Sequence, residues 1–531
     1  MKLNKSFCVA TITAFGVVGC GSVGQMISTN PVNIDKRPMK TTPIKESDLK
    51  RWSHLDIDKD TVPGMSVDRT YKELLKGRKS TPIIVGVVDS GLDIDHPDLK
   101  GKIWTNKKEI VGNKKDDDNN GYIDDIHGWN FLGDANDEQL ELTRIVKKGI
   151  NTPDYAKAKA ELDKKLAEVT PQKEQVDQIS NADKLIRNYL KKDKYTLEDL
   201  KKITTTEESL LKSKMIMTSI ATQAGEGFQS EIKEYIDYVY GQLNYNLNVD
   251  FNGRKTGDNP EDINDKKYGN NNVKGLDVEN ALHGTHVAGI IAQIRGNKIG
   301  GDGVVDSNIS ILACRAVPNG DEYDKDIALA IRYAVDNGAK VINGSFGKDY
   351  SPHKEWVWDA IKYAESKDVL IVHAAGNDGK DVDIEDNYPT DSMDKSSEIS
   401  DNFLSIGALD SSYGANMVAN FSNYGTKNVD IYSPGMKIYA TVPNGKYKYE
   451  QGTSMASPNV AGVAALIRSY YPNLSAKQVK QIIMESGTSI TIPVVLGENK
   501  ENRPFANACK SGKIINAYNA IIMAEKMSVK K

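Results

Sequence analysis

The sequence predicts an α/β protein with a mostly parallel central sheet and helices on both faces, interrupted by a helical insertion. From residue 82 onward, short apolar runs alternate with helical segments, which is typical of a parallel sheet covered by helices. The runs consist largely of Val, Ile, Leu and Ala, as expected for strands buried on both faces. The predicted strands are 83–88, 309–317, 340–343, 369–375, 403–409 and 429–432.

The insertion is predicted between residues 135 and 272, where the strand pattern nearly disappears and charged helical segments replace it. Six apolar or aromatic residues follow the spacing of one helix face. They are Ile232, Tyr235, Ile236, Val239, Tyr240 and Leu243. We therefore expect the insertion to split one catalytic domain into residues 61–134 and 273–531, the second part ending in a helix over 514–527. The insertion either has a specific role or only covers a face of the domain, since surface loops tolerate long additions at small entropic cost.

The N-terminus has the layout of a secretory signal, with two lysines, an apolar stretch over 7–18 and Gly19 before Cys20. The run 17–20 also resembles a bacterial lipobox, in which the cysteine becomes the lipidated first residue. We expect export from a bacterial cell, either as a lipoprotein anchored to a membrane through Cys20 or as a secreted or periplasmic protein with a plain signal peptide. Residues 21–60 are polar and predict a tether or a short pro-segment.

Composition excludes some classes of partner. The formal net charge of -4 and the interleaved acidic and basic residues argue against a nucleic-acid partner, which would need a basic face. Besides Cys8 and Cys20, the cysteines are Cys314 and Cys509. One possible pair is not a disulfide framework, so stability must come mainly from a core. Whether these two pair, and the oligomeric state, remain open.

Four polar residues stand where α/β sheets build their sites, at strand ends and helix starts. Asp89 follows the strand 83–88, and Asn377 follows the strand 369–375. His283 begins His-Gly-Thr-His-Val-Ala-Gly, and Ser454 lies in Gly-Thr-Ser-Met-Ala-Ser-Pro before an apolar helix. The positive end of that helix dipole favours an oxyanion beside the serine. Each motif is weak alone, but the order Asp, His, Ser is that of one convergent catalytic triad.

On these motifs the chain resembles the subtilase family of serine peptidases over residues 82–133 and 273–524. The resemblance implies a three-layer subtilisin-like fold and endopeptidase activity on proteins or peptides. It also implies a role for each residue: Asp89 orients His283, and His283 acts as general base and then as general acid. Ser454 would form the acyl-enzyme, with its backbone N–H and the Asn377 side chain holding the oxyanion.

Substrate contacts follow from the same resemblance. Ser345, Phe346 and Gly347 resemble the segment that pairs with an extended substrate as an added strand. The opposite wall of the primary specificity pocket would be formed by Ala374, Ala375 and Gly376. Gly344 departs from the bulkier apolar residue expected before Ser-x-Gly, which leaves the shape of the pocket open.

A loop rich in carboxylates, residues 116–125, is the best candidate for a metal site. Its alternating oxygen side chains and glycine suit a hard cation, and calcium fits best. Its candidate ligands occupy the first, third, fifth, seventh and ninth positions of an EF-hand-like spacing: Asp116, Asp118, Asn120, the Tyr122 carbonyl and Asp124. The twelfth position is His127 rather than glutamate, and a solvated acidic loop is the alternative.

Two further histidines lie close to these motifs, and both are expected to be structural. His286 falls one helical turn after His283, and His373 lies inside a predicted strand. A different class of function also fits the scaffold, namely a catalytically silent binding protein that uses the insertion as its interaction surface. The presence of all four catalytic groups argues against that reading.

Overall fold

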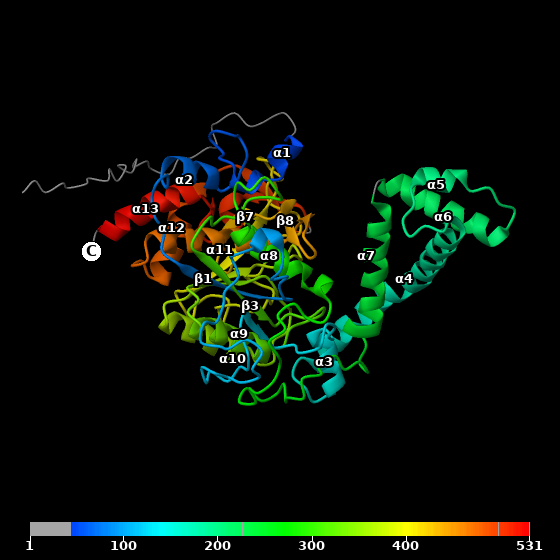
Figure 1. The fold of residues 1–531 in the computed structure, drawn as a ribbon, viewed down its shortest axis with the longest axis horizontal. Coiled ribbons are helices and arrows are strands. Elements are labelled where there is room, and N and C mark those ends of the chain that lie inside the picture. Colours follow the sequence, from blue (N-terminus) through cyan, green and yellow to red (C-terminus); the bar gives the residue numbers. More distant parts are fainter. Residues whose placement is uncertain (1–43, 226, 498, 530–531) are drawn as a thin grey trace, which may run out of the picture.

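The computed structural model describes residues 44–225, 227–497 and 499–529 (Figure 1). Its centre is a sheet of nine strands in the order β10-β13-β7-β6-β5-β4-β1-β3-β2, in which every neighbouring pair is parallel except β10 with β13. The strands are β1 (Ile83–Asp89), β2 (Gly128–Asn130), β3 (Ile309–Arg315), β4 (Val341–Gly344), β5 (Leu370–Ala374), β6 (Phe403–Leu409), β7 (Ile431–Pro434), β10 (Thr488–Ser489) and β13 (Lys513–Ile514). The predicted fold class is confirmed.

Two antiparallel hairpins lie outside this sheet. They are β8 (Ile438–Val442) with β9 (Lys446–Glu450), and β11 (Pro493–Leu496) with β12 (Glu501–Pro504). All six predicted strands occur, each within two residues of its expected bounds. The sequence did not predict β2, β10, β13 or the hairpins, because runs of two to five residues carry little periodicity.

Helices cover both faces of the sheet, as the alternation of strands and helices requires. One face packs against α8 (Leu282–Ala292), α11 (Thr453–Tyr470), α12 (Ala476–Ser486) and α13 (Ala517–Val529). The other packs against α9 (Asp324–Asp336) and α10 (Lys354–Ser366). Residues alternate between the two cores along β1, with Val87 in the first and Val88 in the second.

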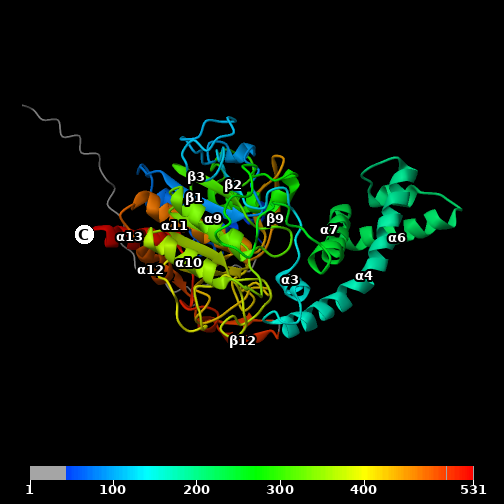
Figure 2. The same ribbon diagram turned by 90° about the horizontal axis from the view of Figure 1, so that it is seen from below.

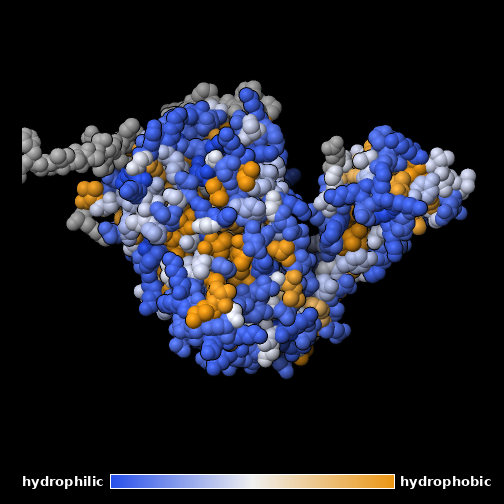
Figure 3. All heavy atoms as spheres, in the orientation of Figure 1, coloured by the Kyte–Doolittle hydropathy of each residue, from blue (hydrophilic) through white to orange (hydrophobic). Residues whose placement is uncertain are grey.

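The segment between β2 and α8 contains an arm of helices that projects from the body (Figures 1 and 2). Its helices are α3 (Glu141–Lys148), α4 (Tyr155–Leu190), α5 (Leu197–Lys202), α6 (Glu208–Ala224) and α7 (Phe228–Gly241), followed by one π-helical turn (Gln242–Asn246). At 36 residues α4 is about 54 Å long, so its far half extends well beyond the sheet. Figure 3 shows a notch between arm and body.

The arm has its own apolar cores. Near the body, Leu142, Leu162 and Val239 pack together with Tyr350 of the body. Farther out, Ile186, Tyr195 and others form a second cluster. Because each cluster is built by two or more helices, the arm is a packed unit rather than a single exposed helix.

The chain before β1 packs on the body. It contains α1 (Glu46–Leu49) and α2 (Val67–Glu73). Trp52, in the segment expected to be a tether, is 1% exposed, and its Nε1 donates to the carbonyl of Met436 at 2.9 Å. Of the segment 21–60, Trp52 therefore belongs to the core, and Ile44, Leu49, Leu55 and Ile57 pack against it. The signal and Cys20 lie outside the described residues.

Two further observations concern the chain as a whole. Among the described residues, no helix combines the length and apolar character needed to cross a membrane. Cys314 and Cys509 are both buried free thiols, so the possible pair is not a disulfide.

Candidate active site

Asp89 and His283 meet at the carboxyl end of β1. The His283 Nδ1 and Asp89 Oδ1 atoms lie 2.7 Å apart, and the Ser90 backbone N–H donates to the same oxygen at 2.7 Å. Asp89 is 1% exposed, whereas the His283 side chain is 38% exposed. The buried carboxylate therefore engages Nδ1, and Nε2 is the ring nitrogen left to exchange protons with a ligand.

A glycine permits this approach. A Cβ atom on Gly284 would lie 2.0 Å from the Gly91 carbonyl oxygen and 3.1 Å from Asp89 Oδ1. The start of α8 can therefore approach the end of β1 only because residue 284 has no side chain.

The electrostatic surroundings of His283 favour its charged form. Burial opposes protonation, but the negative charge of Asp89, the hydrogen bond to it and the more distant charge of Glu450 together raise the pKa of His283 above its ordinary value. An imidazole with this environment is suited to accept a proton and hold it transiently.

Ser454 is the second residue of α11, which packs against α8, the helix of His283. Its hydroxyl donates to the Ser345 carbonyl at 3.3 Å, and the described residues include no hydrogen bond from it to His283. Such contacts are often long in free enzymes and tighten when substrate binds. The serine hydroxyl is thus at the helix N-terminus, where the dipole stabilises negative charge.

Asn377 lies beside this helix start. Its Oδ1 accepts hydrogen bonds from the backbone N–H and the hydroxyl of Thr453, at 2.8 and 2.9 Å. These contacts fix the amide so that Nδ2 remains as a donor. A Cβ atom placed on Gly452, whose φ is +149°, would lie 3.6 Å from both Asn377 Nδ2 and the Ser454 backbone N. Both nitrogens therefore border one small space that a glycine keeps open.

The two expected substrate walls flank this space. Ser345 Oγ donates to the Ser454 carbonyl at 2.9 Å, which ties the first wall to the nucleophile. In the part of the chain that the structure describes, the backbone N–H groups of Phe346 and Gly347 have no backbone acceptor, so this edge can receive another strand. On the second wall, Ala374 ends β5, Ala375 is buried, and the Gly376 N–H donates to Thr453 Oγ1 at 3.1 Å.

The other two histidines are packed in the body. His286 is fully buried, and its Nε2 lies 3.1 Å from the carbonyl oxygens of Ile438 and Lys448. Its burial lowers its pKa to about 3. His373 lies between the rings of Phe346 and Phe403, and burial lowers its pKa to about 4. Both therefore stay neutral at ordinary pH and have structural roles.

The carboxylate loop brings together a different set of residues from the one the spacing indicates. Ligand oxygens of Glu109, Asp116 and Asp118 lie within 4.8 Å of one another. The Asp124 carboxylate instead accepts backbone N–H bonds from Gly112 and Lys114, at 3.0 and 2.8 Å.

The remaining two candidates are held within the loop itself. Asn120 Oδ1 accepts the Tyr122 N–H at 2.8 Å, and the Tyr122 ring packs on Tyr333, 4.7 Å between centroids. Sequence reasoning missed Glu109 because it lies seven residues before the acidic run, outside any motif. Three carboxylates on a tightly turned loop are hard oxygen ligands that suit calcium.

The arm borders the site on two sides. Lys448 of β9 and Glu234 of α7 form an ion pair at 3.0 Å, and Lys448 also pairs with Glu450 at 3.0 Å. On the other side, a cavity of about 640 Å³ is lined by Asn377 and Asp378 of the body and by residues of α4, including Lys164. The arm therefore stands next to the catalytic face rather than behind the sheet.

A buried Asp–His pair, a serine in the first turn of a helix and two N–H groups beside one small space are the elements of a serine-hydrolase site on an α/β fold. Comparison with known families narrows the class of hydrolase. The sequence profile of the subtilase family matches residues 80–507, so the chain belongs to the subtilase family.

Individual relatives agree with this assignment. The chain is 40% identical over 223 residues to a thermophilic serine proteinase of Bacillus sp. strain AK1, which covers 42% of this chain and 50% of the relative. It is 31% identical over 311 residues to subtilisin-like protease 1 of Plasmodium falciparum, covering 54% and 42%. With subtilisin DY of Bacillus licheniformis it shares 35% over 210 residues, covering 39% and 71%.

The chain thus spans about half the length of the first of these relatives. A solved structure, that of the prenylagaramide maturation protease PagA, is similar at 29% identity and a TM-score of 0.37, covering 46% of this chain and 82% of the other.

Proposed function

We propose that the protein is a serine endopeptidase that hydrolyses peptide bonds of proteins through an acyl-enzyme on Ser454. The observation that carries the proposal is the hydrogen bond between His283 and buried Asp89, beside a helix that carries Ser454 in its first turn. Family membership supports the same reaction.

The roles follow from the geometry. His283 takes the Ser454 proton as Oγ attacks the scissile carbonyl carbon, and Asp89 stabilises the imidazolium. The oxyanion accepts hydrogen bonds from Asn377 Nδ2 and the Ser454 N–H. His283 then gives its proton to the departing amine, the C–N bond breaks, and water hydrolyses the ester by the same steps. Ser345, Phe346 and Gly347 would bind the substrate strand, and Ala374, Ala375 and Gly376 would face it.

Casein and a peptide library, together with a phosphonofluoridate and mass spectrometry, test the proposal. We expect proteolysis and one covalent adduct on Ser454. A folded protein with neither turnover nor adduct would instead favour the catalytically silent binding protein.

Asn377→Asp tests the oxyanion donors. The substitution keeps the oxygen that Thr453 contacts but replaces the Nδ2 donor with a second acceptor. We expect kcat to fall about 10²- to 10³-fold, which is the loss of kcat known for removing the corresponding asparagine of subtilisin. KM and the melting temperature should change little. A kcat within threefold of the unmodified enzyme would remove Asn377 from the mechanism.

Calcium binding is a second part of the proposal. Glu109, Asp116 and Asp118 would hold the ion, which supplies positive charge that ties the loop together and takes no part in the chemistry. We expect a chelator to lower the unfolding free energy by about 2.7 kcal/mol relative to calcium at 100 times its Kd. The matched variant Asp116→Asn/Asp118→Asn should be insensitive to the chelator. Equal stability of the unmodified protein with and without calcium would contradict the proposal.

We further propose that the protein is exported and anchored by lipid on Cys20, with the arm (135–272) inserted between catalytic segments 61–134 and 273–531. Support for the anchor is the lipobox-like run before Cys20. Labelling of cells with a palmitate analogue should mark the protein and not its Cys20→Ala variant. An unlabelled protein would favour the secreted or periplasmic form.

A further inference from the structure

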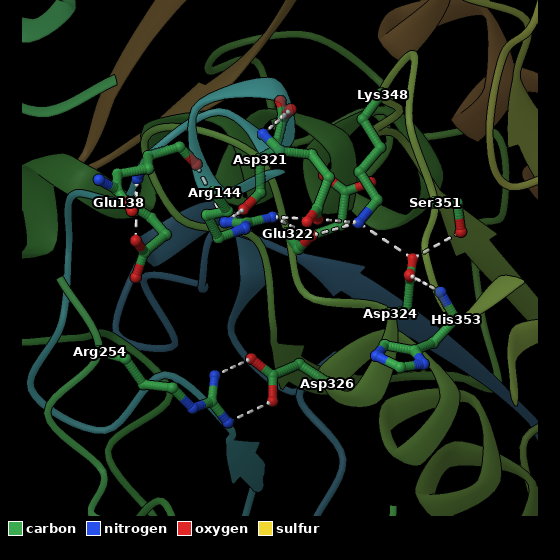
Figure 4. A network of polar contacts seen from close by, with 12 residues as sticks. Glu138, Arg144, Arg254, Asp321, Glu322, Asp324, Asp326, Lys348, Ser351 and His353 are labelled. Atoms are coloured by element: carbon green, nitrogen blue, oxygen red, sulfur yellow. Dashed lines mark hydrogen bonds and ion pairs between the residues drawn. The ribbon is translucent and has the colours of Figure 1, made fainter. Parts of the chain in front are cut away.

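Arm and body meet in a buried network of charged side chains (Figure 4). The body contributes the start of α9 and the segment before it, together with Lys348. The arm side contributes α3 and the segment that leads back to α8. The members are Glu141, Arg144, Arg254, Asp258, Asp321, Asp324, Lys325, Asp326 and Lys348, and Arg144 and Lys348 also donate to the backbone carbonyl of Glu322. Charges buried so deeply are stable only when they are paired.

Lys348 is a body residue that contacts the arm directly. Its side chain is 2% exposed, and its Nζ lies 2.8 Å from Glu141 Oε2 and 3.0 Å from Asp324 Oδ1. It also donates to the Glu322 carbonyl at 2.8 Å. Figure 4 shows the lysine reaching in between Glu322 and Asp324. Each donor position of the ammonium group is therefore engaged, one of them by the arm.

Glu141 is buried and ionised in this contact. It is buried on α3, and Arg144 pairs with the same Oε2 atom that accepts from Lys348. Burial alone would raise the pKa of Glu141, but the two cations outweigh it and lower the pKa to about 2. The carboxylate therefore carries its charge at every pH at which a peptidase of this class works.

The position of Lys348 in the chain connects this pair to the site. It directly follows Gly347, the last residue of the proposed substrate strand. Its backbone pairs with Tyr388 in both directions, at 3.0 and 2.9 Å. The strand is thus held at one end by Ser345 on Ser454 and at the other by the backbone and side chain of Lys348. Losing the side-chain contact would loosen the free edge between them.

We propose that Lys348 is a positioning residue for the substrate strand Ser345–Gly347 and that Glu141 of the arm holds it in place. The arm is then a working part of the substrate site rather than a surface addition. This role rests on the proposed peptidase function and deepens it, because it makes binding of extended substrates depend on the arm.

The test compares two substrates with the same residue before the scissile bond, a single-residue ester and an extended peptide ester. Only the extended one pairs with the strand. We expect Glu141→Gln to raise KM about tenfold for the extended ester and less than twofold for the short one. A tenfold rise is the effect of losing about one backbone hydrogen bond to the substrate. Phosphonofluoridate labelling of Ser454, which counts folded active sites, should proceed at the normal rate.

Two further variants separate positioning from stability. Lys148→Gln removes a charge from the exposed face of the same helix, where Lys148 pairs with Glu261, and should leave both KM values unchanged. The double variant Glu141→Gln/Lys348→Met removes both charges of the pair and should recover part of the stability lost by the single variant, since the Lys348 ammonium no longer lies beside a neutral amide. Arg144 keeps its hydrogen bonds to the carbonyls of Gln139, Asp321 and Glu322. We expect its KM for the extended ester to stay high.

If the double variant recovered the original KM for the extended ester together with stability, the pair would be purely structural and the inference would be overturned. An equal change for both esters, or none, would also overturn it. An unmodified protein that hydrolyses neither ester would instead refute the peptidase function itself.

Discussion

Ser454→Ala is expected to lower kcat by roughly 10⁶, the magnitude found for the nucleophile of subtilisin. The alanine variant has no oxygen to form the ester, so only the oxyanion donors and substrate binding remain. These alone leave a residual acceleration of about 10³–10⁴ over water. The loss of kcat is measured by steady-state hydrolysis of a peptide ester. The burst of product in the unmodified enzyme counts its active sites.

A second serine of the same helix is the matched control. Ser457 is fully buried, and its hydroxyl contacts Asn343 Oδ1 at 2.8 Å and the Val372 carbonyl at 3.1 Å. We expect Ser457→Ala to cost about 1–3 kcal/mol of stability while chemistry continues, because it leaves buried polar groups without a partner. Ser454→Ala should fold normally, since its hydroxyl makes one long contact. Residual activity above 1% in Ser454→Ala would mean that another group is the nucleophile.

The positions of the catalytic candidates could be predicted because each depends on a local pattern. Asp89 and Asn377 follow runs of buried strand residues, and His283 and Ser454 lie in the first turns of apolar helices. Carboxyl ends of parallel strands share one edge of the sheet, so strand assignment alone brings these residues to the same face. The precise hydrogen bond between Asp89 and His283 also needs Gly284, whose role emerges only when the two elements are in contact.

The charged network could not be predicted in this way. Residues 321–326 read Asp-Glu-Tyr-Asp-Lys-Asp, a composition typical of an exposed loop. Four of them are buried, namely Glu322, Asp324, Lys325 and Asp326. The segment is held by Arg144, which contacts the Asp321 carbonyl from 177 residues away, and by Arg254, which contacts Asp326 from 72 residues away. Local propensity carries no information about such partners. For the same reason Trp52 lies in the core although the polar sequence around it suggests a tether.

Asp89→Asn is expected to lower kcat about 10⁴-fold, because an amide favours the wrong imidazole tautomer and no longer stabilises the imidazolium. The variant should also change the pH profile. With the Asp89 charge gone, burial dominates and the pKa of His283 falls. Since the base acts in its neutral form, the acid limb of kcat/KM should move to lower pH while the plateau drops.

Glu450→Gln provides a graded comparison for that shift. Glu450 raises the pKa of His283 by its charge, and in the described part of the chain it has no hydrogen bond to the ring. Its removal should therefore move the acid limb in the same direction by less, with the plateau preserved. The raised pKa also stabilises the fold below about pH 6.5, and this contribution fades as the pH rises through the folded-state pKa of His283. In Asp89→Asn, where burial lowers the pKa of His283, the melting temperature should therefore no longer fall as the pH rises through that window. An acid limb that stays in place in both variants would show that His283 is not the titrating base.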